Sequence, residues 1–488
     1  MKTVILGILF LSSFIYTGCS QDIEAANEIK LSDIFAVNGC TSPLSDNYDP
    51  NATENDGTCA PTDCSKCDFF VAVSNESFGF DGEELGVKPG DIICLDGSRT
   101  YTRPIAFKNI QGTAENPVLI TNCNGQAKVD LPGRAYAIST NNCQFFRITG
   151  AGDPDVEYGI SISNVSSKGL DLNNLSSNFE IDRLEISKIG FAGIMAKTDP
   201  TCDDATTRGN FTMRDVSIHH NYVHDTDGEG FYIGNSFYAN GRNLECGKRL
   251  PHDIVDIKVY SNIFRNTGWE ALQVGCAIQG AEIYNNDIEN FGMANKNGQR
   301  NGIQIGEGTG GLCYNNRIVN GNGNGMNVLG YGDNIIFNNL IVDAKRNGVF
   351  CDERYSPGDG FKFYNNTIVN PGIDGIKILS KNLSNKIYNN IIVNPGFFDE
   401  YENDNKSTEG EDAYVNHRPN TEVKSNYFTR NIEDLKFINA NQKNFDLSAQ
   451  SPAIDSGRNI TSYDIIYDLL GRNRSSGDGI DIGAFESQ

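Results

Sequence analysis

The 488-residue sequence has few tryptophans (1), methionines (5) and histidines (5). Beyond the N-terminus it lacks any run of about 20 apolar residues, which excludes an internal transmembrane helix. Basic residues are also few: 40 Lys and Arg face 63 Asp and Glu, giving a net charge of −23. Because so acidic a surface repels nucleic acid phosphates, we expect no nucleic acid partner.

Glycine and asparagine are abundant instead, with 51 glycines in the chain. Both residues tolerate left-handed backbone and form helices poorly, so the composition favours a turn-rich β architecture over a helix bundle. Hydrophobic residues make up 38% and aromatic residues 10% of the chain. This is enough apolar material for a sizeable core, and it excludes wholesale disorder.

An internal repeat predicts the fold. An apolar-aromatic-polar phrase ending in asparagine recurs at 218–221, 259–262, 283–286, 313–316, 336–339, 363–366 and 387–390. Four residues after each of these asparagines comes a second Asp or Asn. A short segment in which apolar residues alternate with others then follows, such as Gly302–Ile305. Short alternating strands at this spacing describe stacked coils of parallel strands, with asparagines forming a ladder at matching turns. We therefore predict an all-β, right-handed parallel β-helix, flanked by an N-terminal Cys-bracketed module and a C-terminal cap.

The N-terminus predicts export. A basic start and an apolar run from Val4 to Ile15 precede Cys19, and this resembles the lipobox of bacterial lipoproteins, although Tyr16 stands where leucine is usual. The resemblance implies cleavage before Cys19, lipidation of that residue and a membrane anchor. The expected location is the outer membrane or cell surface of a Gram-negative bacterium; an ordinary secretory signal is the alternative. The expected domains are 1–18 (signal peptide), 19–67 (tether and Cys-bracketed module), 68–398 (β-helix) and 399–488 (acidic loop and closing segment).

The thirteen cysteines leave twelve once Cys19 is set aside, an even number that suits disulfides in an oxidising compartment. Cys40 and Cys59 bracket the short module, and Cys202 and Cys246 stand at the ends of a long insertion that they are placed to close. The connectivity as a whole does not follow from the sequence.

The short module resembles thrombospondin type 3 repeats of exported bacterial proteins. Its acidic and amide side chains are oxygen ligands of the kind that calcium prefers. The predicted metal ligands are Asp49, Asn51, Asn55 and Asp56. A disulfide-closed spacer without metal is the alternative interpretation.

The segments Lys88–Leu95 and Gly112–Ile120 resemble the opening coils of exported polysaccharide lyases such as alginate lyase and chondroitinase B. Ser451–Gly457 and Asp481–Glu486 are similar to the closing segment of exported bacterial β-helix proteins. The resemblance implies an extended polysaccharide as partner. The Arg-His-Gly element associated with those lyases is absent, so their catalytic residues cannot be transferred to this chain.

Stacking the repeats places Tyr232, Gln273, Gln304 and Asn327 in one outward column, about 4.8 Å apart. Such a row suits hydrogen bonds to glycan hydroxyls, and Trp269 and Glu307 complete the predicted substrate-binding residues. The alternative is a solvated sheet face with polar ladders.

Four residues are the predicted catalytic groups: Glu229, Glu270, Lys197 and His220. Glu229 and Glu270 on neighbouring coils either hydrolyse a glycoside, hold calcium against a uronate, or merely cap turns. Lys197 and His220 supply the base and the electrophilic partner that a lyase needs.

The expected function is therefore a polysaccharide lyase acting on a uronate-containing glycan. Two alternatives stay open: a glycoside hydrolase that uses Glu229 and Glu270, and a non-catalytic glycan-binding or adhesive surface protein. We expect function to concentrate in coils 193–307 and the repeats from 334 to be scaffold, except for the charged stretch Cys351–Arg354, which is placed either to flank the groove or to form a surface ion pair.

Overall fold

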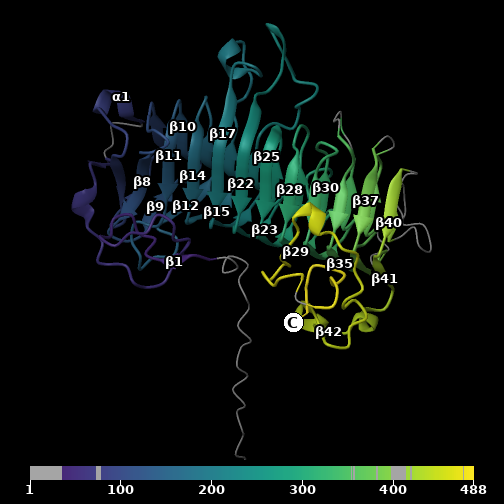
Figure 1. Ribbon diagram of the computed structural model, residues 1–488. Helices are drawn as coiled ribbons and strands as arrows, with labels where there is room; N and C mark the ends of the chain where they lie inside the picture. The colour runs from purple at the N-terminus through teal and green to yellow at the C-terminus, as the bar shows by residue number, and fades with distance from the viewer. Residues whose placement is uncertain are drawn as a thin grey trace, which may run out of the picture. The chain divides into compact units, whose positions relative to one another are not determined.

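The computed structural model describes residues 36–72, 79–352, 354, 358–380, 383–396, 414–417, 420–475 and 477–487. These residues form a right-handed parallel β-helix whose coils stack side by side (Figure 1). The signal segment, Cys19 and most of the predicted acidic loop lie outside the described residues. No helix in the described part of the chain is long and apolar enough to cross a membrane.

Each full coil contributes one strand to each of three parallel sheets, here named A, B and C. Sheet A has twelve strands in the described residues. They are β4 (Gly79–Asp81), β7 (Ile105–Lys108), β10 (Tyr136–Asn141), β13 (Lys168–Leu172), β16 (Ala192–Ala196), β19 (Glu229–Ile233), β24 (Leu272–Val274), β27 (Ile303–Ile305), β30 (Met326–Val328), β33 (Val349–Cys351), β36 (Ile376–Ile378) and β39 (Val415–Asn416).

Sheet B has thirteen described strands. They are β3 (Phe69–Phe70), β5 (Ile92–Asp96), β8 (Val118–Cys123), β11 (Gln144–Thr149), β14 (Ser177–Asp182), β17 (Thr212–His219), β22 (Asp253–Tyr260), β25 (Ala277–Tyr284), β28 (Gly311–Tyr314), β31 (Ile335–Phe337), β34 (Lys362–Tyr364), β37 (Asn385–Tyr388) and β40 (Thr421–Lys424).

Sheet C has twelve described strands. They are β6 (Thr100–Tyr101), β9 (Ala127–Asp130), β12 (Ile160–Val165), β15 (Leu184–Ile189), β18 (Tyr222–Thr226), β23 (Ile263–Thr267), β26 (Asp287–Phe291), β29 (Arg317–Gly321), β32 (Leu340–Ala344), β35 (Thr367–Val369), β38 (Ile391–Val393) and β41 (Tyr427–Thr429).

The core fills the interior of the coils, because alternate residues of every strand point inward. In sheet A the inward column runs through Phe231, Leu272, Ile303 and Met326, all fully buried. This confirms the predicted register of that strand phrase. The neighbouring column through Gln273 and its equivalents therefore faces outward, on the side of the sheet where a ligand can approach.

The corner between sheets B and C is a two-residue turn. Its first residue adopts the left-handed region, with φ of 53° at both Asn285 and Asn315, a conformation in which asparagine is less strained than most residues. Its second residue is a buried asparagine bonded to the next coil: Asn286 Nδ2 donates to Asn316 Oδ1 at 3.0 Å, and Asn316 Nδ2 donates to Asn339 Oδ1 at 3.0 Å. The predicted asparagine ladder is confirmed.

The connections from sheet A to the next strand of sheet B are the longest in the middle of the molecule. The one after β19 contains the hairpin β20 (Arg242–Leu244) and β21 (Gly247–Arg249), and a disulfide ties Cys246 to Cys202 in the preceding connection. Figure 1 shows these teal segments rising from one edge of the coil, opposite the side that carries β1 and β42.

Short elements complete both ends of the described chain. They are β1 (Asn38–Gly39), β2 (Glu54–Asn55), η2 (Cys64–Lys66), α1 (Gly82–Leu85), η3 (Asp204–Thr206), η5 (Ile432–Leu435), β42 (Phe437–Asn439), η6 (Ala440–Gln442), β43 (Asn444–Leu447) and η7 (Thr461–Tyr463). The described disulfides join Cys40 to Cys59, Cys64 to Cys123, Cys67 to Cys94, and Cys202 to Cys246. Four further described cysteines, at 143, 276, 313 and 351, are buried and reduced.

Candidate functional site

The outward column of sheet A forms a continuous polar ladder across three coils. Gln304 Nε2 donates to Gln273 Oε1 at 2.5 Å, and Asn327 Nδ2 donates to Gln304 Oε1 at 2.8 Å. Gln273 Nε2 in turn donates to Ser236 Oγ at 3.1 Å. Because the register pairs these residues strand by strand, their amides lie in one row along the coil axis.

A groove of about 420 Å³ lies over this ladder, and we call it the arginine groove. Its walls come from connections before and after the sheet A strands, so residues far apart in sequence meet there. Its lining includes Ser236, Gln273, Arg300, Gln304, Glu307, Asn327, Arg346, Phe350 and Arg354. Three arginines and one carboxylate in a chain of net charge −23 make this groove locally cationic. Glu307 accepts a hydrogen bond from the Ala239 backbone nitrogen, which ties it to the long connection after β19.

Two other predicted residues extend the row beyond the groove. Tyr232 precedes Gln273 in the same column, and its hydroxyl lies 3.1 Å from Ser236 Oγ. Lys197 Nζ lies 4.7 Å from the centre of the Tyr232 ring. Only 8% of Lys197 is exposed, and its ammonium group donates to Asp199 Oδ1 at 2.9 Å. Lysine and tyrosine therefore lie side by side at one end of the ladder.

Trp269 lies at the corner between sheets C and A and does not line the arginine groove. Its ring packs edge-on against Phe191, with 5.6 Å between ring centroids. Lys296 Nζ lies over the other side of the ring, 3.2 Å from its centre. Both contacts hold the indole against the coil, so its predicted role in substrate binding stays a prediction.

The structure places Glu229 and Glu270 inside the coil, not at the mouth of a groove. Their exposed fractions are 1% and 0%, because they share the inward face of their strands with Phe231 and Leu272. Asn301 Nδ2 donates to Glu270 Oε1 at 3.0 Å, while the Oε2 atom of each glutamate has no hydrogen-bond partner. The two glutamates do lie on neighbouring coils as predicted, but the expectation that both carboxylates face the substrate needs correction.

Burial governs the charge of this pair. Burial raises the pKa of Glu270 to about 7. Burial and, second, the charge of Glu270 raise the pKa of Glu229 well above its ordinary value. Burial without enough compensating donors favours the protonated form of both carboxyls, although the hydrogen bond from Asn301 partly offsets this at Glu270.

His220 also lies away from the arginine groove. It is the first residue of a B–C turn, with φ of 51°, and its Nδ1 lies 2.7 Å from Nδ1 of His219. Its Nε2 faces Glu54 Oε1 of the N-terminal module at 3.3 Å, and burial lowers the pKa of His220. We therefore correct the expectation that His220 joins Lys197 and the two glutamates at one site.

His219 belongs to a buried cluster with Glu180 and Asp182, whose ligand atoms lie within 4.8 Å of one another. Arg147 already occupies this cluster, with Nε 2.8 Å from Asp182 Oδ1 and 3.0 Å from Glu180 Oε1. Burial alone would raise the pKa of Asp182, but the Arg147 charge holds it well below the ordinary value. The guanidinium supplies the positive charge here, so we assign the cluster a structural role.

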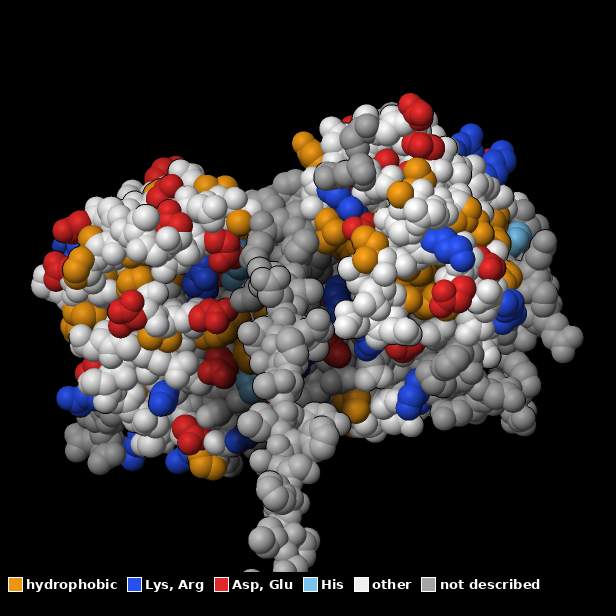
Figure 2. Space-filling view, turned by 90° about the horizontal axis from the view of Figure 1, so that it is seen from below, with side chains coloured by type: hydrophobic (Ala, Val, Ile, Leu, Met, Phe, Trp, Pro, Cys, Tyr) orange, Lys and Arg blue, Asp and Glu red, His pale blue; other side chains and the backbone are white. Residues whose placement is uncertain are grey.

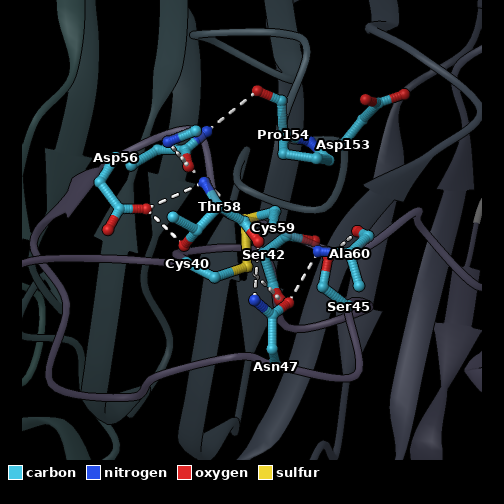
Figure 3. Close-up of a disulfide and its surroundings, with 12 residues drawn as sticks. Cys40, Ser42, Ser45, Asn47, Asp56, Thr58, Cys59, Ala60, Asp153 and Pro154 are labelled. Atoms are coloured by element: carbon cyan, nitrogen blue, oxygen red, sulfur yellow. Dashed lines mark hydrogen bonds between the residues drawn. A yellow bond between two sulfur atoms is a disulfide. The ribbon is translucent and has the colours of Figure 1, made fainter.

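The predicted calcium ligands of the short module make local turns, and Figure 3 shows that of Asp56 with Thr58, beside the Cys40–Cys59 disulfide. Asp56 Oδ1 accepts from the Thr58 nitrogen at 3.0 Å, and Asn55 Oδ1 accepts from the Gly57 nitrogen at 3.1 Å. Asp49 Oδ1 likewise accepts from the Asn51 nitrogen at 2.9 Å. These bonds close Asx turns within the disulfide-bracketed loop. Calcium binding by this module stays a prediction.

Sequence reasoning missed Arg300 and Arg346, because each stands in a connection that carries no repeat signal. Arg354 belongs to the charged stretch singled out above; it lines the groove, and its Nε also lies 3.5 Å from Asp352 Oδ2 in a partly exposed ion pair. The one signal for Arg300 and Arg346 is their position: each lies three residues before the first residue of a strand of sheet A. The lining also extends past residue 334, so the later coils contribute more to this groove than expected.

The chain was compared with known proteins. A family model described as a right handed beta helix region matches residues 252–392. No curated protein sequence matches the chain. A lacto-N-biosidase of family GH136 from Eubacterium ramulus has a similar fold: the TM-score is 0.51 at 14% identity, and the match covers 71% of this chain and 63% of that one.

Two solved lyases also match at lower scores. For pectate lyase Pel9A the TM-score is 0.43 at 15% identity, over 83% of this chain and 90% of that one. For a PL6 family polysaccharide lyase from Pseudopedobacter saltans it is 0.37 at 14% identity, over 72% and 92%. At these identities the likeness concerns the fold alone, so function has to come from the residues of the site.

Proposed function

We propose that this protein is a carbohydrate-active enzyme that cleaves a uronate-containing polysaccharide by β-elimination in the arginine groove. The observation that carries the proposal is the convergence of Arg300, Arg346 and Arg354 on a ladder of side-chain amides. Guanidinium groups pair with carboxylates in a fork geometry, and amides hydrogen-bond to hydroxyls. Together they suit a polymer that carries one carboxylate and several hydroxyls per sugar.

The groups at the end of the ladder suit the chemical step. In β-elimination the C5 proton of a uronate passes to a base, the C4–O bond breaks, and a C4=C5 double bond forms. The leaving oxygen takes up a proton. We assign the arginines to the uronate carboxylate, because neutralising it stabilises the charge that develops on proton removal. Tyr232, beside Lys197 and bonded to Ser236, is our candidate for the proton transfer.

Hydrolysis is the less favoured chemistry. Glycoside hydrolases use two carboxyl groups that flank the scissile bond. Among the described lining residues the arginine groove holds one, Glu307. Glu229 and Glu270 are buried and do not line the groove; Glu270 lies behind Asn301, which does line it and donates to Glu270 Oε1. Binding without cleavage is the second alternative, and the same experiment separates all three.

The test is incubation of the purified protein with a panel of uronate-containing and neutral polysaccharides. We expect products with the ultraviolet absorbance of an unsaturated uronate, from the uronate polymers only. The Arg346→Gln variant should lose about 10- to 100-fold in kcat/KM, since hydrogen bonds to charged groups are worth roughly 1.5–3 kcal/mol. Tyr232→Phe should lose about 100-fold or more in kcat. Arg99→Gln, at an exposed site near the N-terminal end, is the matched control.

New reducing ends without that absorbance would establish hydrolysis instead, and binding without either product would establish a binding module. Full activity of both Arg346→Gln and Tyr232→Phe would show that the groove is wrongly chosen.

The cellular setting is part of the same proposal. We propose an exported protein, held at the outer membrane or cell surface through a lipid on Cys19. Four disulfides among the described residues support an oxidising compartment. Mass spectrometry of the N-terminal peptide tests the lipid, and calorimetry with added calcium tests a metal in the Asp49–Asp56 loop.

A further inference from the structure

A second groove, of about 440 Å³, runs along the corner between sheets B and C, and we call it the corner groove. Its floor is a stack of aromatic rings on consecutive coils: Tyr260, Tyr284, Tyr314 and Phe337, with centroids 4.8–4.9 Å apart. Its far wall is Ile465–Tyr467 of the C-terminal cap, and Thr53 of the N-terminal module closes the other end. Figure 2 looks onto this side of the molecule, with the N-terminal part at left and the C-terminal part at right.

Further along the same corner, the turn asparagines are hydrogen-bonded to the backbone of the C-terminal cap. Asn389 Nδ2 donates to the Arg458 carbonyl oxygen at 2.8 Å, and Asn389 Oδ1 accepts from the Arg458 nitrogen at 2.8 Å. Asn365 Nδ2 donates to the carbonyl oxygens of Asp481 and Gly483. In these coils, side-chain amides of the turn residues therefore pair with extended backbone, as one strand pairs with another.

In the corner groove, the side-chain amides of Asn285 and Asn315 have no cap backbone paired with them within the described residues. Asn285 and Asn315 occupy the equivalent turn position on neighbouring coils, and they are 6% and 4% exposed. The Oδ1 atom of each has no hydrogen-bond partner. Since buried polar groups are nearly always paired, two such acceptors in adjacent coils call for a donor from outside. At Asn338, the equivalent residue of the next coil, pairing with the cap backbone is present again: Asn338 Nδ2 donates to the Tyr467 carbonyl oxygen.

We propose that the corner groove binds an extended peptide of a partner protein. The peptide backbone would pair with the amides of Asn285 and Asn315 as Arg458 pairs with Asn389. Its side chains would be mainly apolar, because ring edges, Leu312 and Ile466, 46% exposed, form much of the remaining surface, with Asp464 as the one carboxylate among the described lining residues. None of the described lining residues is Lys or Arg, which distinguishes this surface from the arginine groove and disfavours a uronate chain. The proposal is independent of the enzymatic one.

The test uses the full chain on an array of acetylated and amidated octapeptides, followed by fluorescence anisotropy with the peptides that bind. The double variant Asn285→Gly/Asn315→Gly removes both amides and keeps the left-handed turns. Asn290→Gly/Asn320→Gly is the matched control, with φ of 61° and 58° in the same two coils at the C–A corner. Ile466→Glu changes the exposed wall without touching the coil.

We expect binding to fall at least tenfold in the first double variant and in Ile466→Glu, and to stay unchanged in the control. Loss of binding in the control as well would overturn the proposal. So would the absence of any peptide whose binding depends on Asn285 and Asn315. Saturable binding of a neutral oligosaccharide that depends on the same residues would assign the groove to a saccharide instead.

Discussion

The coil carries two polar rows made by the same repeat, and they differ in what they leave unpaired. The ladder of second-turn asparagines at the B–C corner is buried, and Asn316 Nδ2 alone donates to Ile283 O, Tyr314 O and Asn339 Oδ1. The amide row of sheet A runs along an open groove, with Gln304 joined only to its neighbours in the row. A fully satisfied row stabilises the stack, whereas an open row retains hydrogen-bonding capacity for a ligand.

The largest effect expected from this comparison is on stability. Asn316→Ala would leave the buried Asn286 nitrogen without its acceptor and would remove the side-chain donor to Ile283 O and Tyr314 O. A buried unpaired group costs about 1–3 kcal/mol, so with the lost amide bonds we expect a loss of about 3 kcal/mol in unfolding free energy. Chemical denaturation measures it. Asn320→Ala, in the same coil but at the exposed C–A corner, should cost about 1 kcal/mol; equal losses would abolish the distinction between the rows.

Next in size is the pH dependence set by Glu270. Its folded-state pKa of about 7 exceeds the ordinary 4.5, so between these values the folded chain holds a proton that the unfolded chain releases. Unfolding free energy therefore falls as pH rises from about 4.5 to 7, by on the order of 3 kcal/mol, and levels off above.

Glu270→Gln removes this titration, so the variant should be more stable than the wild type at pH 8 and vary less with pH. Denaturation at several pH values between 4 and 8 checks both points. A wild-type stability that instead rises over this range would show that Glu270 is ionised in the folded state.

The smallest effect belongs to the open row. Gln304→Ala removes one amide from the arginine groove and should raise KM about 5- to 10-fold, the equivalent of about 1 kcal/mol. Unfolding free energy should change by less than about 1 kcal/mol, since Asn327 is partly exposed and the truncation opens Gln273, itself 3% exposed, to water in the groove. Gln279→Ala, at an exposed site of β25, serves as control. A large stability loss with unchanged KM would make the sheet A row structural, like the asparagine ladder.

Prediction from the sequence succeeded where the repeat itself carries the information. The alternation in Gly302–Ile305 implies which residues point inward, and the structure confirms it for Ile303 and its equivalents. It is wrong for Glu229 and Glu270. Their place next to the strands suggests the mouth of a groove, but each lies two residues before an inward-pointing residue and therefore points inward as well. His220 was grouped with Lys197 by sequence proximity, yet the two belong to different corners of the coil.

The sequence by itself determined the coil, its inward and outward columns and the asparagine turns, since each follows from a short period and from local backbone preference. Only the tertiary structure decided where the charges meet. Arg300 comes from the connection before β27, and Arg346 and Arg354 come from the connections on either side of β33; stacking the coils brings all three to one row of amides. The same stacking sets the cap against one part of the B–C corner and leaves the Oδ1 atoms of Asn285 and Asn315 without a hydrogen-bond partner among the described residues. Which coils a distant segment covers depends on packing that no local pattern encodes.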